Sequence, residues 1–333
     1  MAHLEDGTPT CRDVMAKGTL EIFGLFTLLL PMAYIYIFAK PYKPYHRGFF
    51  CDDQNLKHPF SEQTVPIVQC VVIWAVCSVS LIILVEMLRS GAERRARQEA
   101  GRSKPIQGSK TPWIAVELYR HFGFFTLGAL STLLFTEMAK YTIGRLRPHF
   151  LTICKPDYSD ELCKGEGGYL KFVEGDEKEV CRGLVENGGT TTPEMLHEAR
   201  LSFLSGHSSF SFFCATFLIV YLQARLTNFP HVENMFIRAT YRTLKILRPF
   251  IQFAMITLAF WISLTRISNY FHHPYDVVTG ALVGISFALI TLGVTADLFN
   301  KRSAFWRSVQ RQASLPPGPG RQEGRQEAQD SRM

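Results

Sequence analysis

From Val65 to Val85 the sequence reads VPIVQCVVIWAVCSVSLIILV, 21 residues without a charge. About 20 apolar residues in a helix suffice to cross the hydrocarbon core of a bilayer. After this run the chain becomes basic, with Arg94, Arg95 and Arg97 in a short polar segment. An apolar run that ends at a basic flank is typical of a membrane span whose flank lies in the cytosol.

Five further runs have a similar length and composition. They cover residues 20–39, 114–139, 208–224, 249–265 and 277–296. The run at 114–139 is the weakest, because it contains four charged or titratable side chains. A soluble helical bundle could contain any one such run, but six at this spacing favour a membrane protein. The predicted fold class is therefore all-α integral membrane, with six transmembrane helices in a domain over residues 20–297.

Composition and charge support this prediction. The chain has 333 residues, of which 47% are hydrophobic, and this excludes an intrinsically disordered protein. Lys and Arg number 21 in segments 1–19, 88–113, 225–248 and 297–333, against 14 in segments 40–64, 140–207 and 266–276. The positive-inside rule therefore places the N-terminal arm 1–19 and a largely disordered tail, 298–333, in the cytosol. The run at 20–39 is too internal for a signal peptide, and we expect it to be retained.

Four cysteines fall in segments that this orientation places outside the cytosol. They are Cys51, Cys154, Cys163 and Cys181. An oxidising compartment would let them form two disulfides in any of three pairings. The alternative is four free thiols, and the sequence alone does not choose a pairing.

Three short polar segments at the ends of the spans could carry chemistry. The first, KYTIGRLRP, puts Lys140 and Arg147 two helical turns apart, on one face of a continuing helix. These cations could bind an anion or could be anchors at the head-group level. The second, SFLSGHSS, presents Ser205, Gly206 and His207 where a span begins. That arrangement suits an anion but also suits a plain helix N-cap.

The third segment, TRISNYFHHPYD over residues 265–276, lies between two spans. It contains Arg266 and two histidines, and Asp276 follows His272 by four residues, a spacing at which a carboxylate could hold the ring proton. An interfacial polar loop is the plainer interpretation. Counting the crossings places all three segments on the same side of the membrane, outside in this orientation. Together they offer cations for a phosphoryl group and imidazoles for transfer through a phosphohistidine.

The order of these residues resembles the type 2 phosphatidic acid phosphatase family: Lys, six residues, Arg-Pro; then Ser-Gly-His; then Arg, five residues, His, three residues, Asp. The six-span plan and the segment RGFFCDD at 47–53 are similar to its lipid phosphate phosphatase branch. The resemblance covers roughly residues 17–300. It implies hydrolysis of lipid phosphate monoesters without a metal ion or other cofactor. Candidate substrates are phosphatidate, lysophosphatidate, ceramide 1-phosphate and sphingosine 1-phosphate.

The resemblance also implies a role for each residue. His272 would be the nucleophile with Asp276 orienting it, and His207 would be the general acid and then the base. The phosphoryl oxygens would be bound by Lys140, Arg147, Arg266, Ser205 and Gly206. Two positions depart from the family pattern, since Leu204 stands where Pro is usual and Thr265 where Ser is usual. Leu204 puts the turn before His207 in doubt, whereas Thr265 keeps a hydroxyl.

Two other functions stay open at this point. A head-group transferase would use the same phosphohistidine but need a lipid acceptor, and a silent membrane scaffold or lipid-binding protein would release no phosphate. The expected partners are lipid phosphates, the membrane and, from the resemblance, further copies of the chain; no nucleic acid is expected. The expected location is the plasma membrane with the site outside, or an internal membrane with the site facing the lumen.

Overall fold

The computed structural model describes residues 27, 30, 34, 44–99, 113–156, 168–170, 180–227, 229 and 232–313, without the side chains of residues 97–99, 113, 116 and 294–313. Apart from three isolated positions, the predicted span at 20–39 lies outside these residues, as do the arm at 1–19 and residues 314–333 of the predicted tail. The chain divides into two compact units, Met1–Leu289 and Ile290–Met333. Every contact described below belongs to the first unit.

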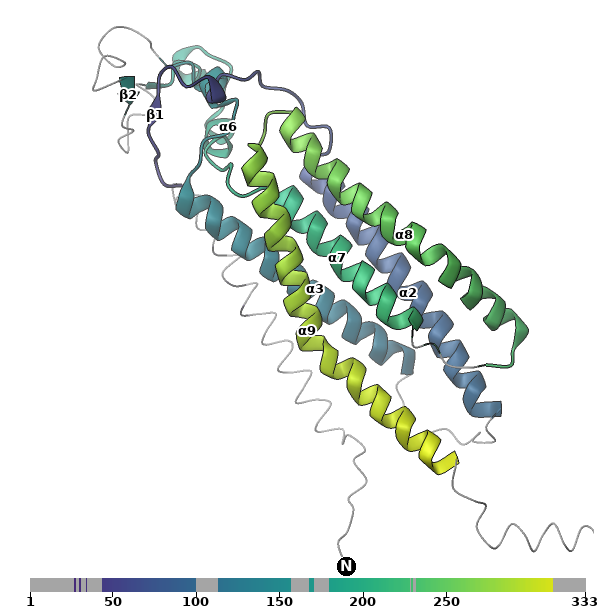
Figure 1. Cartoon of the computed structure of the whole chain (residues 1–333). Helices are drawn as coiled ribbons and strands as arrows, with labels where there is room; N and C mark the ends of the chain where they lie inside the picture. Colours follow the sequence, from purple (N-terminus) through teal and green to yellow (C-terminus); the bar gives the residue numbers. More distant parts are fainter. Residues whose placement is uncertain are drawn as a thin grey trace, which may run out of the picture. The chain divides into compact units, whose positions relative to one another are not determined.

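Five long helices make up most of the described chain. They are α2 (Ile67–Glu99), α3 (Trp113–Ile143), α7 (Gly206–Thr227), α8 (Met235–Ser268) and α9 (Pro274–Ala313) (Figure 1). Each contains a segment long and apolar enough to span a membrane. The predicted helical membrane fold is therefore confirmed, with five of the six expected spans among the described residues.

All five helices extend beyond the apolar runs that predicted them, and α8 and α9 are two examples. Helix α8 begins at Met235 rather than near residue 249, because basic residues spaced by three or four positions occupy one face without interrupting the helix. Helix α9 continues to Ala313, well past the end of its apolar run at residue 296, and the part of the predicted tail from Ser314 onward lies outside the described residues. Hydropathy marks where a helix meets lipid, and it does not mark where the helix ends.

Helix α7 lies at the centre of the bundle, packed against α2, α3 and α8 (Figure 1). Its first turns carry small polar side chains, and Ser208, Ser209 and Ser211 are fully buried. Helix α9 approaches α7 closely: a Cβ added at Gly280 would lie 2.7 Å from the carbonyl oxygen of Ser205. Small residues at a helix crossing allow two backbones to come this near. The start of α7 is thereby fixed against the start of α9.

A small cap covers the end of the bundle at which α7 begins (Figure 1). It contains β1 (Phe49–Phe50), η2 (Gln54–Leu56), α4 (Phe150–Cys154), β2 (Tyr169–Leu170), η4 (Val185–Asn187) and α6 (Pro193–Glu198). Strands β1 and β2 pair in antiparallel fashion, with Phe49 opposite Leu170. The cap has its own apolar core, in which the rings of Phe49 and Phe150 meet edge to face at 5.5 Å.

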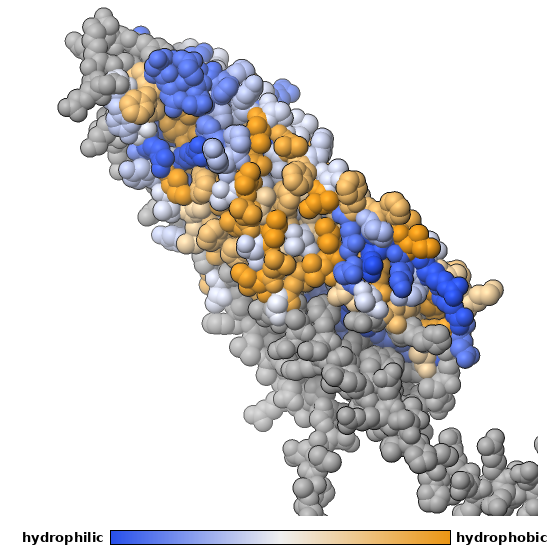
Figure 2. Space-filling view, in the orientation of Figure 1, coloured by the Kyte–Doolittle hydropathy of each residue, from blue (hydrophilic) through white to orange (hydrophobic). Residues whose placement is uncertain are grey.

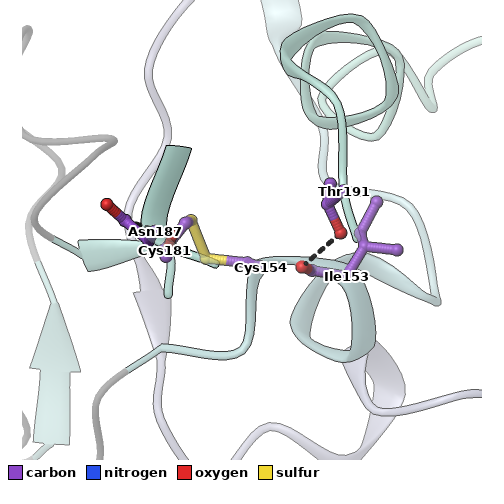
Figure 3. The surroundings of a disulfide bond; sticks show 5 residues. All are labelled: Ile153, Cys154, Cys181, Asn187 and Thr191. Atoms are coloured by element: carbon purple, nitrogen blue, oxygen red, sulfur yellow. Dashed lines mark hydrogen bonds between the residues drawn. A yellow bond between two sulfur atoms is a disulfide. The ribbon is translucent and has the colours of Figure 1, made fainter. Parts of the chain in front are cut away.

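A disulfide joins Cys154, at the end of α4, to Cys181 (Figure 3). Beside it, the Thr191 hydroxyl donates a hydrogen bond to the carbonyl oxygen of Ile153 at 2.9 Å (Figure 3). Cys51 is also disulfide-bonded. Of the four predicted candidates, only Cys163 lies outside the described residues. The Cys154–Cys181 bond holds together the polypeptide that connects α3 to α7.

The surface agrees with a membrane environment. On the face shown in Figure 2, apolar side chains form a broad band between two hydrophilic regions. Large apolar residues point outward from several helices, among them Val72 on α2, Phe253 on α8 and Leu282 on α9. A water-soluble protein rarely exposes so many large apolar side chains, whereas in a membrane they would contact lipid.

Candidate active site

The three polar segments come together at the capped end of the bundle. Lys140 and Arg266 lie in the last turns of α3 and α8, and Gly206 and His207 begin α7 directly after Ser205. Asp276 lies in the first turn of α9. Arg147 follows α3, and His272 lies between α8 and α9. Backbone hydrogen bonds join the segments directly. The Ser202 N–H donates to the carbonyl oxygen of Arg145 at 2.9 Å, and the Ser205 N–H donates to that of Asp276 at 3.1 Å.

His272 is buried, and its ring is held by the main chain. Its Nδ1 lies 2.6 Å from the carbonyl oxygen of Ser202. Because a carbonyl only accepts, Nδ1 carries the proton and Nε2 keeps its lone pair. Burial and the nearby cations Arg147 and Lys140 hold the pKa of His272 well below its ordinary value. The ring is therefore neutral near pH 7, which is the form that a nucleophile needs.

Asp276 is fully buried and reaches His272 through another residue. Its Oδ2 lies 4.0 Å from His272 Nδ1, beyond hydrogen-bonding distance. Instead, the Ser202 hydroxyl donates to that oxygen at 2.6 Å, while the Ser202 carbonyl accepts from His272. The guanidinium of Arg145 donates to the other carboxylate oxygen at 2.7 Å. Ser202 and Arg145 lie within two of the polar segments identified in the sequence, but the sequence analysis assigned a role to neither residue.

The two arginines at the site keep donors that no described residue accepts. Arg147 donates to Glu198 at 2.8 Å, and Arg266 donates to Gln63 at 3.1 Å. Within the described chain, buried atoms left without a partner include Arg147 Nε, Arg266 Nε and Nη2, and Ser205 Oγ. Leaving such a group unsatisfied costs about 1–3 kcal/mol, so a cluster of them indicates a ligand. The charges of the arginines require that ligand to be an anion.

The remaining predicted residues, Lys140, Gly206 and His207, belong to the same site as these unpartnered donors. Lys140 forms an ion pair with Glu137 at 2.7 Å, and its Nζ would lie 3.5 Å from a Cβ added at Gly206. A side chain at Gly206 would therefore occupy the region in front of the ammonium group. His207 Nε2 lies 3.1 Å from the carbonyl oxygen of Val65. Val65 belongs to the segment that leads into α2.

Sequence reasoning missed the contribution of the segment before α2. Gln63 and Val65 contact Arg266 and His207, although they lie more than a hundred residues away in the chain. Gln63 and Val65 belong to no polar motif, so no sequence signal would have found them. Phe271, in the loop between α8 and α9, is another site residue that the sequence did not single out. The guanidinium carbons of Arg147 and Arg266 each lie 5.4 Å from the centre of its ring.

Two further histidines surround the site. His149 Nδ1 bonds the carbonyl oxygen of Tyr270 at 2.8 Å, and burial together with Arg147 lowers its pKa to about 4. His273, the neighbour of His272, has its Nε2 3.1 Å from the carbonyl oxygen of Leu146. Burial and the charge of Arg145 lower the pKa of His273 too. Both rings are thus neutral and are engaged with main-chain carbonyl groups.

The sequence of this chain is similar to a known domain family and, over most of its length, to several known proteins. Residues 122–299 match the model of the PAP2 superfamily. A putative phosphatidate phosphatase of Drosophila melanogaster is 36% identical over 88% of this chain and 72% of its own length. Phospholipid phosphatases 1 and 2 of Mus musculus are 32% and 33% identical over 86% and 85% of this chain, each over 87% of its own length. No solved structure matches the chain. The motif-based resemblance is confirmed: the chain belongs to the PAP2 superfamily.

Proposed function

We propose that this protein hydrolyses lipid phosphate monoesters through a covalent phosphohistidine on His272. The observation that carries the proposal is the set of buried, unpartnered donors on Arg147, Arg266 and Ser205 beside a neutral imidazole. The names of the relatives, phosphatidate phosphatase and phospholipid phosphatase, support the substrate class. Phosphatidate, lysophosphatidate, ceramide 1-phosphate and sphingosine 1-phosphate are the proposed substrates.

The first step is attack by His272 Nε2 on phosphorus. The bond from Nδ1 to the Ser202 carbonyl holds the ring, so the lone pair of Nε2 forms the N–P bond while the bond from phosphorus to the lipid oxygen breaks. Protonated His207 gives its proton to the departing alkoxide. In the second step neutral His207 takes a proton from water, and the hydroxide displaces the histidine to yield inorganic phosphate.

Fixed cations stabilise the transferring group in this proposal. Lys140, Arg147 and Arg266 would neutralise the phosphoryl oxygens, and Ser205 and Gly206 would approach them at the start of α7. Metal ions perform the same neutralisation in many phosphoryl-transfer enzymes. We therefore propose that turnover needs no metal ion or other cofactor.

We also propose that the site faces outward, at the plasma membrane or toward the lumen of an internal membrane. The support is the cap: Cys154 of the Cys154–Cys181 disulfide ends α4, and His149, just before α4, contacts the carbonyl oxygen of Tyr270 two residues before His272. Disulfides persist mainly in oxidising compartments. The basic residues near the opposite helix ends agree with a cytosolic location for that end.

The test is a phosphate assay combined with trapping of the intermediate. Purified full-length protein in detergent should release phosphate from phosphatidate in EDTA, and labelled substrate should leave acid-labile, base-stable phosphate on the protein. His272→Ala should abolish both signals. His273→Ala is the matched control and should keep the adduct, since that ring is held away from the anion site by Leu146.

Each other outcome identifies a different function. An adduct that survives in His272→Ala would move the nucleophile to another residue. Turnover that requires Mg²⁺ would refute the metal-free mechanism. A product that forms only with a lipid acceptor would indicate the transferase, and no product at all would indicate a scaffold.

A further inference from the structure

A cavity lies at the end of the bundle away from His207 and His272. It has a volume of about 850 Å³ and is formed by the C-terminal part of α2, the start of α3 and the start of α8. Two arginines of α2, Arg94 and Arg95, line it together with the apolar residues Met87, Ile114 and Phe236. No step of the proposed reaction uses this cavity.

The cavity lies at the level of lipid head groups. A helix rises about 1.5 Å per residue, so Met87 is roughly 30 Å along α2 from Ile67, which is about one hydrocarbon thickness. Arg94 is about 10 Å further along. Met87 therefore reaches the edge of the hydrocarbon core, and the two arginines reach the head-group layer of the leaflet opposite the catalytic site.

The cavity lining changes from apolar to basic along α2, from the hydrocarbon core toward the head groups. Met87 and Phe236 are 59% and 78% exposed, so an acyl chain could lie against them. Arg94 and Arg95 are exposed, and neither forms an ion pair with another described residue. Figure 2 shows hydrophilic side chains gathered over this end of α8, beside apolar ones. Arginine pairs well with phosphate oxygens and tolerates an interfacial position.

A buried ionic cluster fixes the walls of the cavity. Arg225 of α7 lies 2.7 Å from Glu86 of α2 and 2.8 Å from Glu117 of α3, and it also contacts His121. Arg89 of α2 donates to the carbonyl oxygen of Arg225 at 3.0 Å. Glu86, Glu117 and His121 are spaced as metal ligands could be, but the guanidinium of Arg225 already supplies their cation. The cluster joins α2 to α3 directly beneath the cavity.

We propose that this cavity binds the head group of an anionic phospholipid from the leaflet opposite the catalytic site. The phosphate would lie between Arg94 and Arg95, and an acyl chain would follow Met87 and Phe236 toward the bilayer centre. Arg94 is about 40 Å along α2 from Ile67, and Ile67 follows Val65, whose carbonyl oxygen contacts His207. A lipid bound at Arg94 is therefore too far from the catalytic histidines to be a substrate. The site is independent of the reaction that we propose for the other end.

The experiment measures retained lipid on the purified full-length protein. Native mass spectrometry after delipidation and titration with phosphatidylserine should show saturable binding, and phosphatidylcholine should bind far more weakly. The double variant Arg94→Gln, Arg95→Gln should weaken phosphatidylserine binding by roughly 25-fold, about fivefold for each of the two interfacial charges removed. Thermal unfolding of the same variant should match that of the unchanged protein, which shows that the fold is intact.

The matched control is Arg242→Gln. Arg242 is an exposed arginine of α8 that does not line the cavity, so the variant should bind phosphatidylserine as the unchanged protein does. Equal losses in the control and the double variant would reduce the site to a diffuse basic surface and overturn the proposal. Equal retention of phosphatidylcholine, or displacement of the lipid by millimolar inorganic phosphate, would overturn it as well.

Discussion

Ser202 connects the buried carboxylate to the proposed nucleophile. Its hydroxyl donates to Asp276, and its carbonyl accepts from His272. Substitution to Ala removes the hydroxyl but leaves the carbonyl, so Ser202→Ala should keep the histidine tautomer and loosen the carboxylate. Since a hydrogen bond to a charged group contributes about 1.5–3 kcal/mol, we expect kcat to fall roughly tenfold or more with little change in KM.

Steady-state kinetics with a soluble aryl phosphate would check this expectation. Ser211→Ala is the control, because Ser211 is an equally buried serine of α7 whose hydroxyl accepts a hydrogen bond from Trp74 rather than contacting Asp276. It should lower thermal stability without lowering kcat. Equal kinetic losses in the two variants would mean that Ser202 acts only through stability.

The pH dependence of the first chemical step follows from His272. Only the neutral ring can attack, and the fraction of neutral ring rises as pH increases through the pKa. Since burial and the cations Arg147 and Lys140 lower the pKa of His272, the acid limb of the phosphorylation rate should lie well below pH 6.5. Arg147→Gln removes one of these causes and should move the limb upward. Rapid-quench measurement of phosphohistidine formation would show a limb at or above pH 6.5 if this is wrong.

The residues of the site could be predicted from sequence only where chemistry depends on residue type. Lys140, His207 and His272 belong to three short polar motifs. Each motif alone could have a purely structural role, but the three together point to a chemical one. Ser202 carries an ordinary hydroxyl, and Val65 contributes a carbonyl group that every residue has. Their roles come from segments that approach only after folding, so no local pattern contains them.

At the scale of elements, the contact between α7 and α9 positions the start of each helix. A Cβ at Gly284 would overlap the backbone of Ser209 and Phe213. We therefore expect Gly284→Ala to push α9 outward, to lower the unfolding temperature and to reduce activity. Fluorescence-detected thermal unfolding in detergent, together with turnover, would measure both effects.

Gly123 of α3 supplies the control for this substitution. A Cβ there meets nothing within 4 Å, and alanine favours a helix over glycine by up to about 1 kcal/mol. Gly123→Ala should therefore be neutral or stabilising. If both variants behave alike, the close approach of α9 to α7 has no energetic importance.

The long helices were predictable because the bilayer imposes a length and a composition on each span. Their extensions were not: α8 continues through residues 235–248, where charges occur on one face. The cap was predictable only as a polar loop with cysteines. Its two-stranded ribbon pairs residues 49–50 with residues 169–170, and such a distant pairing depends on the whole fold.

At the scale of the whole molecule, the disulfide gives a test of orientation. Cys154 and Cys181 are 27 residues apart, and closing a loop of that size typically stabilises by about 2–4 kcal/mol. An impermeant thiol reagent on intact cells should label these positions only after reduction if the protein is at the plasma membrane. Labelling without reduction would contradict the bond. Labelling only after permeabilisation would place the cap in a lumen or in the cytosol.

The ionic cluster at the other end constrains how the chain is made. Glu117 and His121 enter the membrane on α3, but their cation, Arg225, is at the end of α7 and is synthesised about a hundred residues later. Carboxylates without a partner are poorly tolerated in lipid. Helix α3 should therefore wait at the translocon until α7 emerges. Ribosome-arrested chains that stop before residue 206 should cross-link through α3 to the translocon, and chains long enough for residue 227 to have left the ribosome should not.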